Sequence, residues 1–164
     1  MQALLSTWLA HSAGEYQLAE HPAVHTIEEA LLHAPAMPGL MCKNLFVRDG
    51  KGKRHFLVIL PFDKRIDLAA LGRWLQLSKL SMASPERLLQ HLGIAPGAVS
   101  LFALLNDKDH GVELLLDQAV WDAAQVQAHP LRNTATVAMS HAALAAFLLH
   151  TGHAPRVLDV PALA

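Results

Sequence analysis

Lys43 and Asn44 place a cation and a side-chain amide at the start of an apolar run, directly after a loop rich in proline and glycine. No acidic residue stands beside Lys43 in the sequence. A loop that meets a rigid strand is a common position for binding groups. A lysine at the start of a strand is more often a solvated charge that blocks edge pairing. Chemistry alone leaves both interpretations of Lys43 open.

A second group of polar residues lies in the piece HPLRNTATV, which spans residues 129–137. His129 precedes a proline, which favours an extended backbone at the histidine. Asn133 and Thr134 then lead into a β-branched run. The asparagine suits a turn in which it bonds its own backbone, and equally a polar loop group in a binding site. These two interpretations are about equally supported by the residues themselves.

Several other chemistries lack the residues they need. Eleven histidines are present, but His141 and His150 are nine apart and the single thiol, Cys42, has no cysteine partner, so metal-ligand spacing is absent. No Gly-x-Ser-x-Gly elbow occurs. The piece from Gly93 to Gly97 lacks the lysine and hydroxyl of a phosphate loop, and by itself predicts a helix end followed by a turn. We expect no metal and no cofactor.

Composition indicates one soluble domain spanning residues 1–164. The chain has 52% hydrophobic residues, and 13 Lys and Arg nearly balance 14 Asp and Glu. This length and apolar content suit a single core. One cysteine, no recognisable secretory signal and no long apolar span together predict a cytoplasmic protein without a membrane segment.

A local basic stretch interrupts the neutral average. The residues Asp49 and Gly50 predict a hairpin turn between two apolar runs, and cations surround it: Arg48, Lys51, Lys53 and Arg54. Such a cluster suits contact with RNA phosphates. It equally suits a solvated turn that prevents edge pairing.

The apolar periodicity and the capping residues predict a mixed order of helices and strands. Helices are expected at residues 2–11, 27–33, 68–77, 85–92 and 141–151, and strands at 16–21, 45–47, 55–60, 112–117, 133–139 and 156–160. Residues 100–107 are expected to form a strand or an extended loop. The hairpin excludes a purely parallel sheet. The predicted class is α+β, or mixed α/β, with a mixed and largely antiparallel sheet flanked by helices.

Four pieces in this order carry a resemblance: KNLF with the Arg48–Asp49 turn, SPERLL, GIAPGAVS and NTATV. Together they resemble the YbaK-type aminoacyl-tRNA editing domains, and most closely the free-standing prolyl-tRNA deacylases that are similar to the insertion domain of bacterial prolyl-tRNA synthetase. The resemblance runs from about Tyr16 to Asp159, and it implies the fold of those domains.

The resemblance implies hydrolysis of the ester that joins a wrong amino acid to tRNA(Pro), most closely Ala-tRNA(Pro), with no cofactor. Lys43 maps to the family's chief functional residue and is expected to be catalytic. Our hypothesis is that it holds the terminal phosphate or polar groups of the substrate in register. The expected substrate-binding residues are Asn44, Gly93, Ile94, Ala95, Pro96, Gly97, His129, Asn133 and Thr134. Prolyl-tRNA synthetase is a further expected partner.

One departure leaves the substrate open. Family members often carry His-Thr or a similar pair before the lysine, whereas this chain has Met41 and Cys42. A Cys- or Ser-tRNA deacylase therefore remains an alternative. A module that binds tRNA without hydrolysing it is a second alternative.

Overall fold

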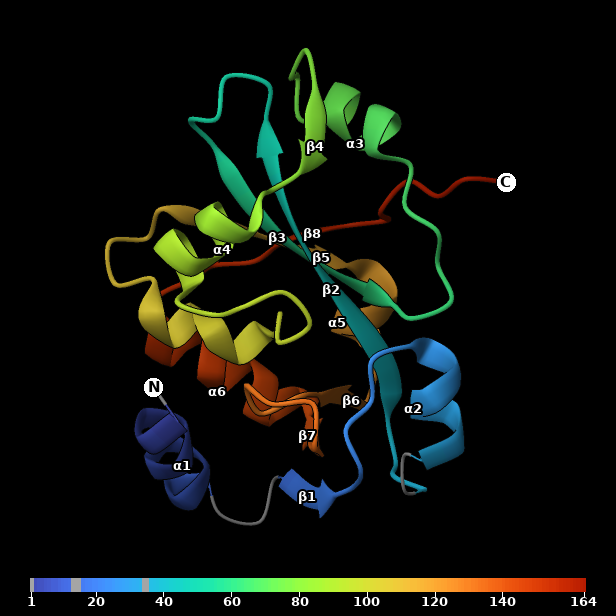
Figure 1. Cartoon of the computed structure of the whole chain (residues 1–164), viewed down its shortest axis with the longest axis vertical. Helices are drawn as coiled ribbons and strands as arrows, with labels where there is room; N and C mark the ends of the chain where they lie inside the picture. Colours follow the sequence, from blue (N-terminus) through green and yellow to red (C-terminus); the bar gives the residue numbers. More distant parts are fainter. Residues whose placement is uncertain (1, 13–15, 34–35) are drawn as a thin grey trace.

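The computed structural model describes residues 2–12, 16–33 and 36–164 (Figure 1). Pro35, the first residue of the loop before Lys43, lies outside these ranges. The elements are α1 (Gln2–His11), β1 (Tyr16–Glu20), α2 (Ile27–His33), β2 (Leu40–Asp49), β3 (His55–Pro61), α3 (Leu68–Trp74), β4 (Leu80–Met82), α4 (Pro85–Leu92), the 3-10 helix η1 (Leu101–Asn106), β5 (Val112–Asp117), α5 (Gln118–Asp122), β6 (Gln125–Ala128), β7 (Ala135–Ser140), α6 (His141–Thr151) and β8 (Arg156–Leu158).

The strands form one mixed sheet in the order β1-β7-β6-β2-β3-β5-β8, with β4 paired to β2 off this path. The pairs β1–β7, β6–β7, β2–β3 and β2–β4 are antiparallel, whereas β2–β6, β3–β5 and β5–β8 are parallel. This arrangement confirms the predicted mixed sheet flanked by helices.

Strand β2 runs through the middle of the molecule and pairs with three other strands (Figure 1). It pairs with β3 from Cys42 to Arg48, but on its other edge it pairs with β6 only at Leu40 and Met41, and with β4 only from Val47 onward. Between these two short pairings, that edge of β2 is bonded to no described strand. The opening lies beside Lys43 and Asn44.

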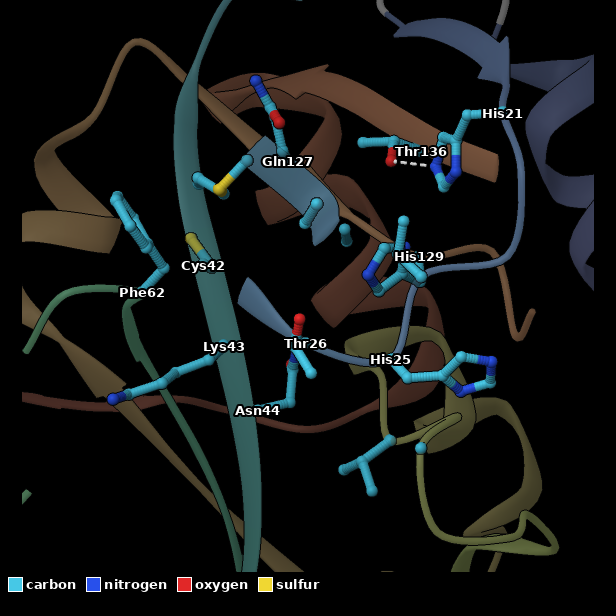
Figure 2. Close-up of a pocket in the computed structure, with 16 residues that line it drawn as sticks. His21, His25, Thr26, Cys42, Lys43, Asn44, Phe62, Gln127, His129 and Thr136 are labelled. Atoms are coloured by element: carbon cyan, nitrogen blue, oxygen red, sulfur yellow. Dashed lines mark hydrogen bonds between the residues drawn. The ribbon is translucent and has the colours of Figure 1, made fainter. Parts of the chain in front are cut away.

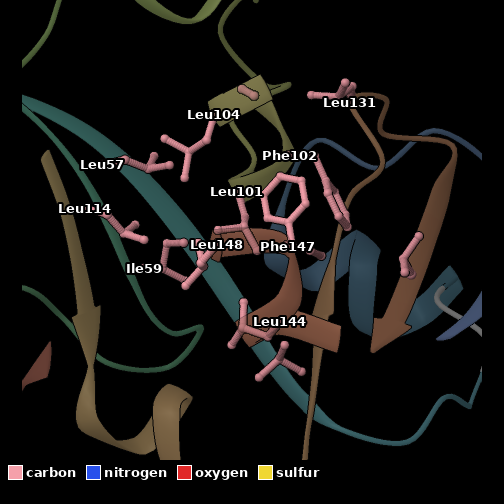
Figure 3. Packing of buried hydrophobic residues seen from close by; sticks show 14 of the residues in the cluster. Leu57, Ile59, Leu101, Phe102, Leu104, Leu114, Leu131, Leu144, Phe147 and Leu148 are labelled. Atoms are coloured by element: carbon pink, nitrogen blue, oxygen red, sulfur yellow. The ribbon is translucent and has the colours of Figure 1, made fainter. Parts of the chain in front are cut away.

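Two apolar clusters pack on the two faces of the sheet. Alternation along β3 directs Leu57 and Ile59 into the larger cluster and Phe56 and Val58 into the smaller one. The larger cluster lies under α1, η1 and α6 (Figure 3), where the rings of Phe102 and Phe147 meet edge to face at 5.2 Å between centroids. Burial on both faces explains why β3 reads as a continuous apolar run.

Side-chain caps set several of the predicted helix boundaries. Asp67, Ser84 and Ser140 each accept a hydrogen bond from a backbone amide three residues ahead. Gly93 ends α4 in the left-handed conformation, with φ of 64°. The helix after Asp67 ends at Trp74, three residues earlier than expected, because the chain turns through Gln76 with φ of 59°.

The predicted strand or extended loop at residues 100–107 is wrong. Residues 101–106 form η1, where the Ser100 hydroxyl accepts from the Phe102 amide and the residues 101–104 are buried. An apolar run of this length has no periodicity that separates a strand from a buried helical turn. The short elements β4, α5 and β6 were not predicted either.

No helix within the described ranges combines the length and the apolar character needed to cross a membrane.

Candidate active site

A cavity of about 300 Å³ lies beside the unpaired edge of β2 (Figure 2). Its described lining comes from the chain before α2, from α2 itself, from β2, and from the segments around β6 and β7. The lining residues are His21, Val24, His25, Thr26, Ala30, Met41, Cys42, Lys43, Asn44, Phe62, Gly97, Val99, Gln127, Ala128, His129 and Thr136. None of them carries a carboxylate.

The divergence of β6 from β2 creates the cavity. The two parallel strands are paired at Met41 and Gln127, after which β2 continues through Lys43 while β6 ends at Ala128. Residues 42–44 and 128–129 therefore lie on either side of a gap that no described strand fills. Sites in sheets often form where neighbouring parallel strands separate at their carboxyl ends.

Lys43 contributes an ammonium group without a counter-ion. No carboxylate among the described residues lies within ion-pairing distance of it. Burial lowers the pKa of Lys43, and the charge of Asp63 opposes this effect only in part. Figure 2 shows its side chain leaving β2 on the side away from His129 and Thr136. The ammonium is therefore free to meet an anionic ligand.

Asn44 offers the cavity a side-chain amide with unused hydrogen-bonding capacity. Its Oδ1 is buried and has no partner among the described residues. An unsatisfied buried acceptor costs about 1–3 kcal/mol, which makes a ligand partner favourable. A half-turn of the amide exchanges its oxygen and nitrogen, so Asn44 can present an acceptor or a donor.

The ring of His129 is fixed by a backbone contact. Its Nδ1 lies 3.0 Å from the carbonyl oxygen of Ala135. A carbonyl can only accept, so Nδ1 carries the hydrogen, and in the neutral ring Nε2 is left as an acceptor. The Ser100 hydroxyl donates to the His129 carbonyl at 2.5 Å, which joins η1 to this segment. His129 thus has a defined tautomer at the cavity wall.

A second pair of residues on this wall was not predicted. His21 Nδ1 donates to the Pro22 carbonyl at 2.8 Å, and His21 Nε2 lies 2.8 Å from the hydroxyl oxygen of Thr136. With His21 neutral, Thr136 must donate its hydrogen to Nε2. The lone pairs of the Thr136 oxygen then remain available, although the residue is only 6% exposed.

The loop after α4 meets the cavity only at its end. Gly97 lines the cavity, whereas Gly93 caps α4, Ile94 packs in the core, and Ala95 and Pro96 are not among the lining residues. The amide of Gly93 donates to the carbonyl of Leu89, so it is not free to bind a ligand. No described group accepts from the Gly97 amide. Gly97 has φ of 86°, a conformation that favours glycine.

Asn133 and Thr134 lie behind the cavity wall. The Asn133 side chain donates to the Val24 carbonyl at 3.1 Å, and the carbonyls of Asn133 and Thr134 accept from the amides of Val24 and His21. These bonds fasten the 21–24 segment to the start of β7. The structure therefore places both residues as supports of His21 and Val24, and neither lines the cavity.

The basic hairpin lies at the opposite end of β2 from the cavity (Figure 1). Lys51 and Lys53 have no described ion-pair partner, whereas Arg54 forms a bidentate pair with Glu113, at 2.7 Å between Nη2 and Oε2. Arg48 bonds the carbonyl of its neighbour. Of the four hairpin cations that the sequence predicts to contact RNA, three have no described counter-ion. The fourth, Arg54, is paired with Glu113.

Arg87 holds this hairpin in place. Its Nη1 donates to the Gly52 carbonyl and to His55 Nε2, both at 3.0 Å. Burial, followed by the charges of His91 and Arg87, lowers the pKa of His55 to about 4. His55 is therefore neutral near pH 7 and accepts from Arg87.

The described residues hold no group of three His, Cys, Asp or Glu side chains able to coordinate a metal. The available chemistry consists of the free ammonium of Lys43, the free backbone amide of Gly97 and several neutral acceptors. This combination can bind an anionic ligand and polarise a carbonyl group.

Several residues that line the cavity were not predicted from the sequence. His21, Val24, Ala30 and Phe62 come from segments whose side chains gave no chemical signal, and Thr136 was seen only as a β-branched strand residue. The pair His21 and Thr136 is separated by 115 positions. Only the pairing of β1 with β7 brings the two together.

Comparisons with known proteins agree on one family. The model of the aminoacyl-tRNA editing domain matches residues 21–147, a span that contains every described lining residue of the cavity. The prolyl-tRNA editing protein ProX of Acetoanaerobium sticklandii is 37% identical over 145 residues, which cover 88% of each chain.

Two further comparisons cover nearly the whole chain. Prolyl-tRNA synthetase associated domain-containing protein 1 of Bos taurus is 33% identical over 163 residues, covering 97% of this chain and 95% of the relative. A solved structure, proposed to be a trans-editing enzyme for prolyl-tRNA synthetase, aligns with a TM-score of 0.69 at 24% identity. The alignment covers 97% of this chain and 92% of that one, and it supports the fold.

The Cys42 thiol is expected to be unreactive in the folded protein, because burial raises its pKa to about 12. At pH 8 its thiolate fraction is then about 1,000-fold below that of an ordinary thiol. Alkylation by iodoacetamide, followed by mass spectrometry, should be slower than that of glutathione by a comparable factor and should recover in urea. Rapid labelling of the folded protein would restore Cys42 as a candidate nucleophile.

Proposed function

The chain belongs to the aminoacyl-tRNA editing domain family, and from this premise we propose that it hydrolyses the aminoacyl ester of tRNA(Pro) charged with a wrong small amino acid. It is an enzyme of the aminoacyl-tRNA deacylase class. We take residues 1–164 as one editing domain. Alanine is the proposed amino acid.

One observation supports this reaction more than any other. The described lining of the cavity includes Lys43, which has no described carboxylate partner, and Gly97, whose amide has no described acceptor. It contains no carboxylate, and burial raises the pKa of its one thiol, that of Cys42. We infer that such a site does not rely on a carboxylate or a thiolate as the nucleophile and that its donors stabilise negative charge. An activated ester needs little more than this, since water can be the nucleophile.

The proposed reaction proceeds through a tetrahedral intermediate. Water adds to the ester carbonyl carbon, and the Gly97 amide donates to the developing oxyanion. The 2′-hydroxyl of the terminal ribose assists the water. The carbon–oxygen bond to the ribose then breaks, the ribose oxygen takes the proton lost by the water, and free amino acid and tRNA are released.

Lys43 has a positioning and electrostatic part in this proposal. Its ammonium binds the phosphate of the terminal nucleotide, which holds the ester in register with the Gly97 amide. A counter-ion would compete for the same charge, so the absence of a described carboxylate partner suits the role. Asn44 and His129 provide hydrogen-bonding groups to the ribose and the aminoacyl group.

We propose that the apolar side chains of the lining limit the room for the amino-acid side chain. These residues are Val24, Ala30, Met41, Phe62 and Val99. Steric exclusion of proline can discriminate more strongly than the absence of a single methylene group. Cysteine and serine differ from alanine by one atom and remain the competing substrates.

The tRNA body is proposed to contact the hairpin end of β2. Arg48, Lys51 and Lys53 provide charge there, and Arg54 shares its charge with Glu113. Phosphate contacts of this kind are independent of sequence and depend on salt. Prolyl-tRNA synthetase is a proposed partner because the relatives and one similar structure are named for it.

A tRNA-binding module without activity would keep the hairpin but would not need the free donors of the cavity. The free Lys43 ammonium favours the enzyme over this alternative.

Lys43→Ala is expected to lower kcat/KM for Ala-tRNA(Pro) by about 100-fold, the value of a charge-assisted hydrogen bond of roughly 3 kcal/mol. Lys108→Ala is the matched control, because Lys108 is a lysine that lies outside the cavity and has no described ion pair. Release of labelled alanine measures both. A Lys43→Ala rate near that of the control would remove Lys43 from the mechanism.

Deacylation of Ala-, Cys- and Ser-tRNA(Pro) by one enzyme preparation is expected to be fastest for alanine. We expect the apolar side chains of the lining, among them Val24 and Val99, to penalise the extra volume of serine and cysteine. Correctly charged Pro-tRNA(Pro) is the control and should remain intact. Faster hydrolysis of the cysteine ester would contradict the proposal that alanine is the preferred amino acid.

The double variant Lys51→Glu/Lys53→Glu is expected to weaken tRNA binding and to reduce the slope of log K against log salt by about 2, one unit for each phosphate that the hairpin no longer neutralises. Filter binding at several salt concentrations gives the slope. The single variant Lys108→Glu makes the same kind of exchange outside the hairpin and is the control for position, with half the change in net charge. An unchanged slope would show that Lys51 and Lys53 are solvated and do not contact the tRNA.

A further inference from the structure

The wall of the cavity formed by β7 and its neighbours presents acceptors without donors. His129 Nε2 is an acceptor because Nδ1 is committed to the Ala135 carbonyl, and the Thr136 oxygen is an acceptor because its hydrogen is committed to His21. Strand β7 links the two residues. Its first residue, Ala135, accepts the hydrogen bond of the His129 ring, and Thr136 is the next residue in the strand. This acceptor wall consists of His129 Nε2 and Thr136 Oγ1.

The arrangement is fixed by a relay of bonds that the substrate does not have to make. Pro22 orients His21, His21 orients the Thr136 hydroxyl, and the edge-to-face contact of the His21 and His129 rings, at 6.2 Å between centroids, keeps the two imidazoles together. Preorganised acceptors bind a donor without the cost of their own reorientation. The relay thus prepares the wall for a ligand group with at least two N–H or O–H bonds.

The lining also contains donors. Lys43 carries a positive charge, and Figure 2 shows its side chain directed away from Thr136 and His129. The Gly97 amide, from which no described group accepts, is a second donor of the lining. A positively charged ligand group is repelled by Lys43 and attracted by the acceptor wall.

We propose that the acceptor wall binds the free α-ammonium group of the aminoacyl ester, and that the enzyme consequently rejects esters whose amino group is acylated. This inference rests on the proposed function and specifies its substrate class. Among the polar groups of an aminoacylated nucleotide, the ammonium combines positive charge with three N–H bonds. It therefore matches a wall of acceptors better than a ribose hydroxyl does.

Acylation removes the features that the wall recognises. An N-acetyl or peptidyl group abolishes the charge, leaves one N–H and adds a carbonyl oxygen that faces lone pairs. Thr136 has no spare hydrogen to offer that oxygen while it donates to His21. The site would thereby spare tRNA that carries a growing or blocked chain and act on newly charged tRNA.

The first experiment compares Ala-tRNA(Pro) with N-acetyl-Ala-tRNA(Pro) at equal concentration. The acetylated ester is expected to react about 100-fold more slowly in kcat/KM, because it cannot form the charge-assisted hydrogen bonds of the ammonium. Rates within threefold of each other, with Ala-tRNA(Pro) hydrolysed, would overturn the inference and leave the proposed function intact.

The second experiment tests the wall itself. Thr136→Val keeps the shape but removes the acceptor, and should raise KM for Ala-tRNA(Pro) and shrink the discrimination against the acetylated ester by about tenfold. Thr136→Ser should retain the discrimination. The control Thr151→Val makes the same exchange at the end of α6, where the hydroxyl bonds only Leu148. A ratio unaltered in Thr136→Val would remove Thr136 from recognition.

A binding measurement separates the two proposals. Calorimetry with 3′-alanylamino-3′-deoxyadenosine and its N-acetyl form uses a stable amide in place of the ester. The free amine should bind about tenfold tighter or more. If neither ester were hydrolysed, the proposed function would fail, while this affinity ratio would still decide the inference. Equal affinities would overturn it.

Discussion

The cavity depends on one interruption of backbone pairing. Strand β2 needs partners for its amides and carbonyls along its whole length, and β3 satisfies only one edge. On the other edge, the pairing with β6 ends at Met41 of β2, and the pairing with β4 begins at Val47 of β2. The exposed stretch between them is the segment that carries Lys43 and Asn44. Unpaired backbone polar groups are costly when buried, so such a gap must remain accessible to water or to a ligand.

Lys43 and Lys64 show how neighbouring groups determine the pKa of a lysine and whether its charge is already paired. Lys64 is partly buried, yet its hydrogen bonds to Asp117 and Asp159 outweigh that burial and raise its pKa. Lys43 is also partly buried but has no described carboxylate partner, and its pKa is lowered. The first lysine ties β3 to the C-terminal segment. The second has no described ionic partner, which fits its position at the cavity.

The elements that sequence predicts well are those with local signals. Asp49 and Gly50 specify a turn, Ser84 and Pro85 a helix start, and Gly93 a helix end, each through bonds among near neighbours. The 3-10 helix η1 and the short strand β6 lack such signals, because tertiary burial and pairing decide them.

The same distinction applies to the candidate site. Lys43, Asn44, Gly97 and His129 were selected from sequence and line the cavity. Thr136 carries no local mark, since its role depends on a bond to His21, which strand pairing alone supplies. Asn133 and Thr134 support the wall from behind, and Gly93 caps α4 without lining the cavity. A motif identifies a segment, whereas the side chain that reaches the ligand is set by the direction of each residue in the fold.

Strand β2 also fixes the separation between the two surfaces that the tRNA would use. Five residue steps lead from Lys43 to Arg48, or about 17 Å at 3.3 Å per residue. Arg87 holds the hairpin beyond Arg48 through Gly52 and the neutral His55, so the hairpin cations stand at a set distance from the cavity. A ligand that reaches both must extend along the strand. An RNA with its 3′ end in the cavity meets this requirement, while a free aminoacyl nucleotide is too short to do so.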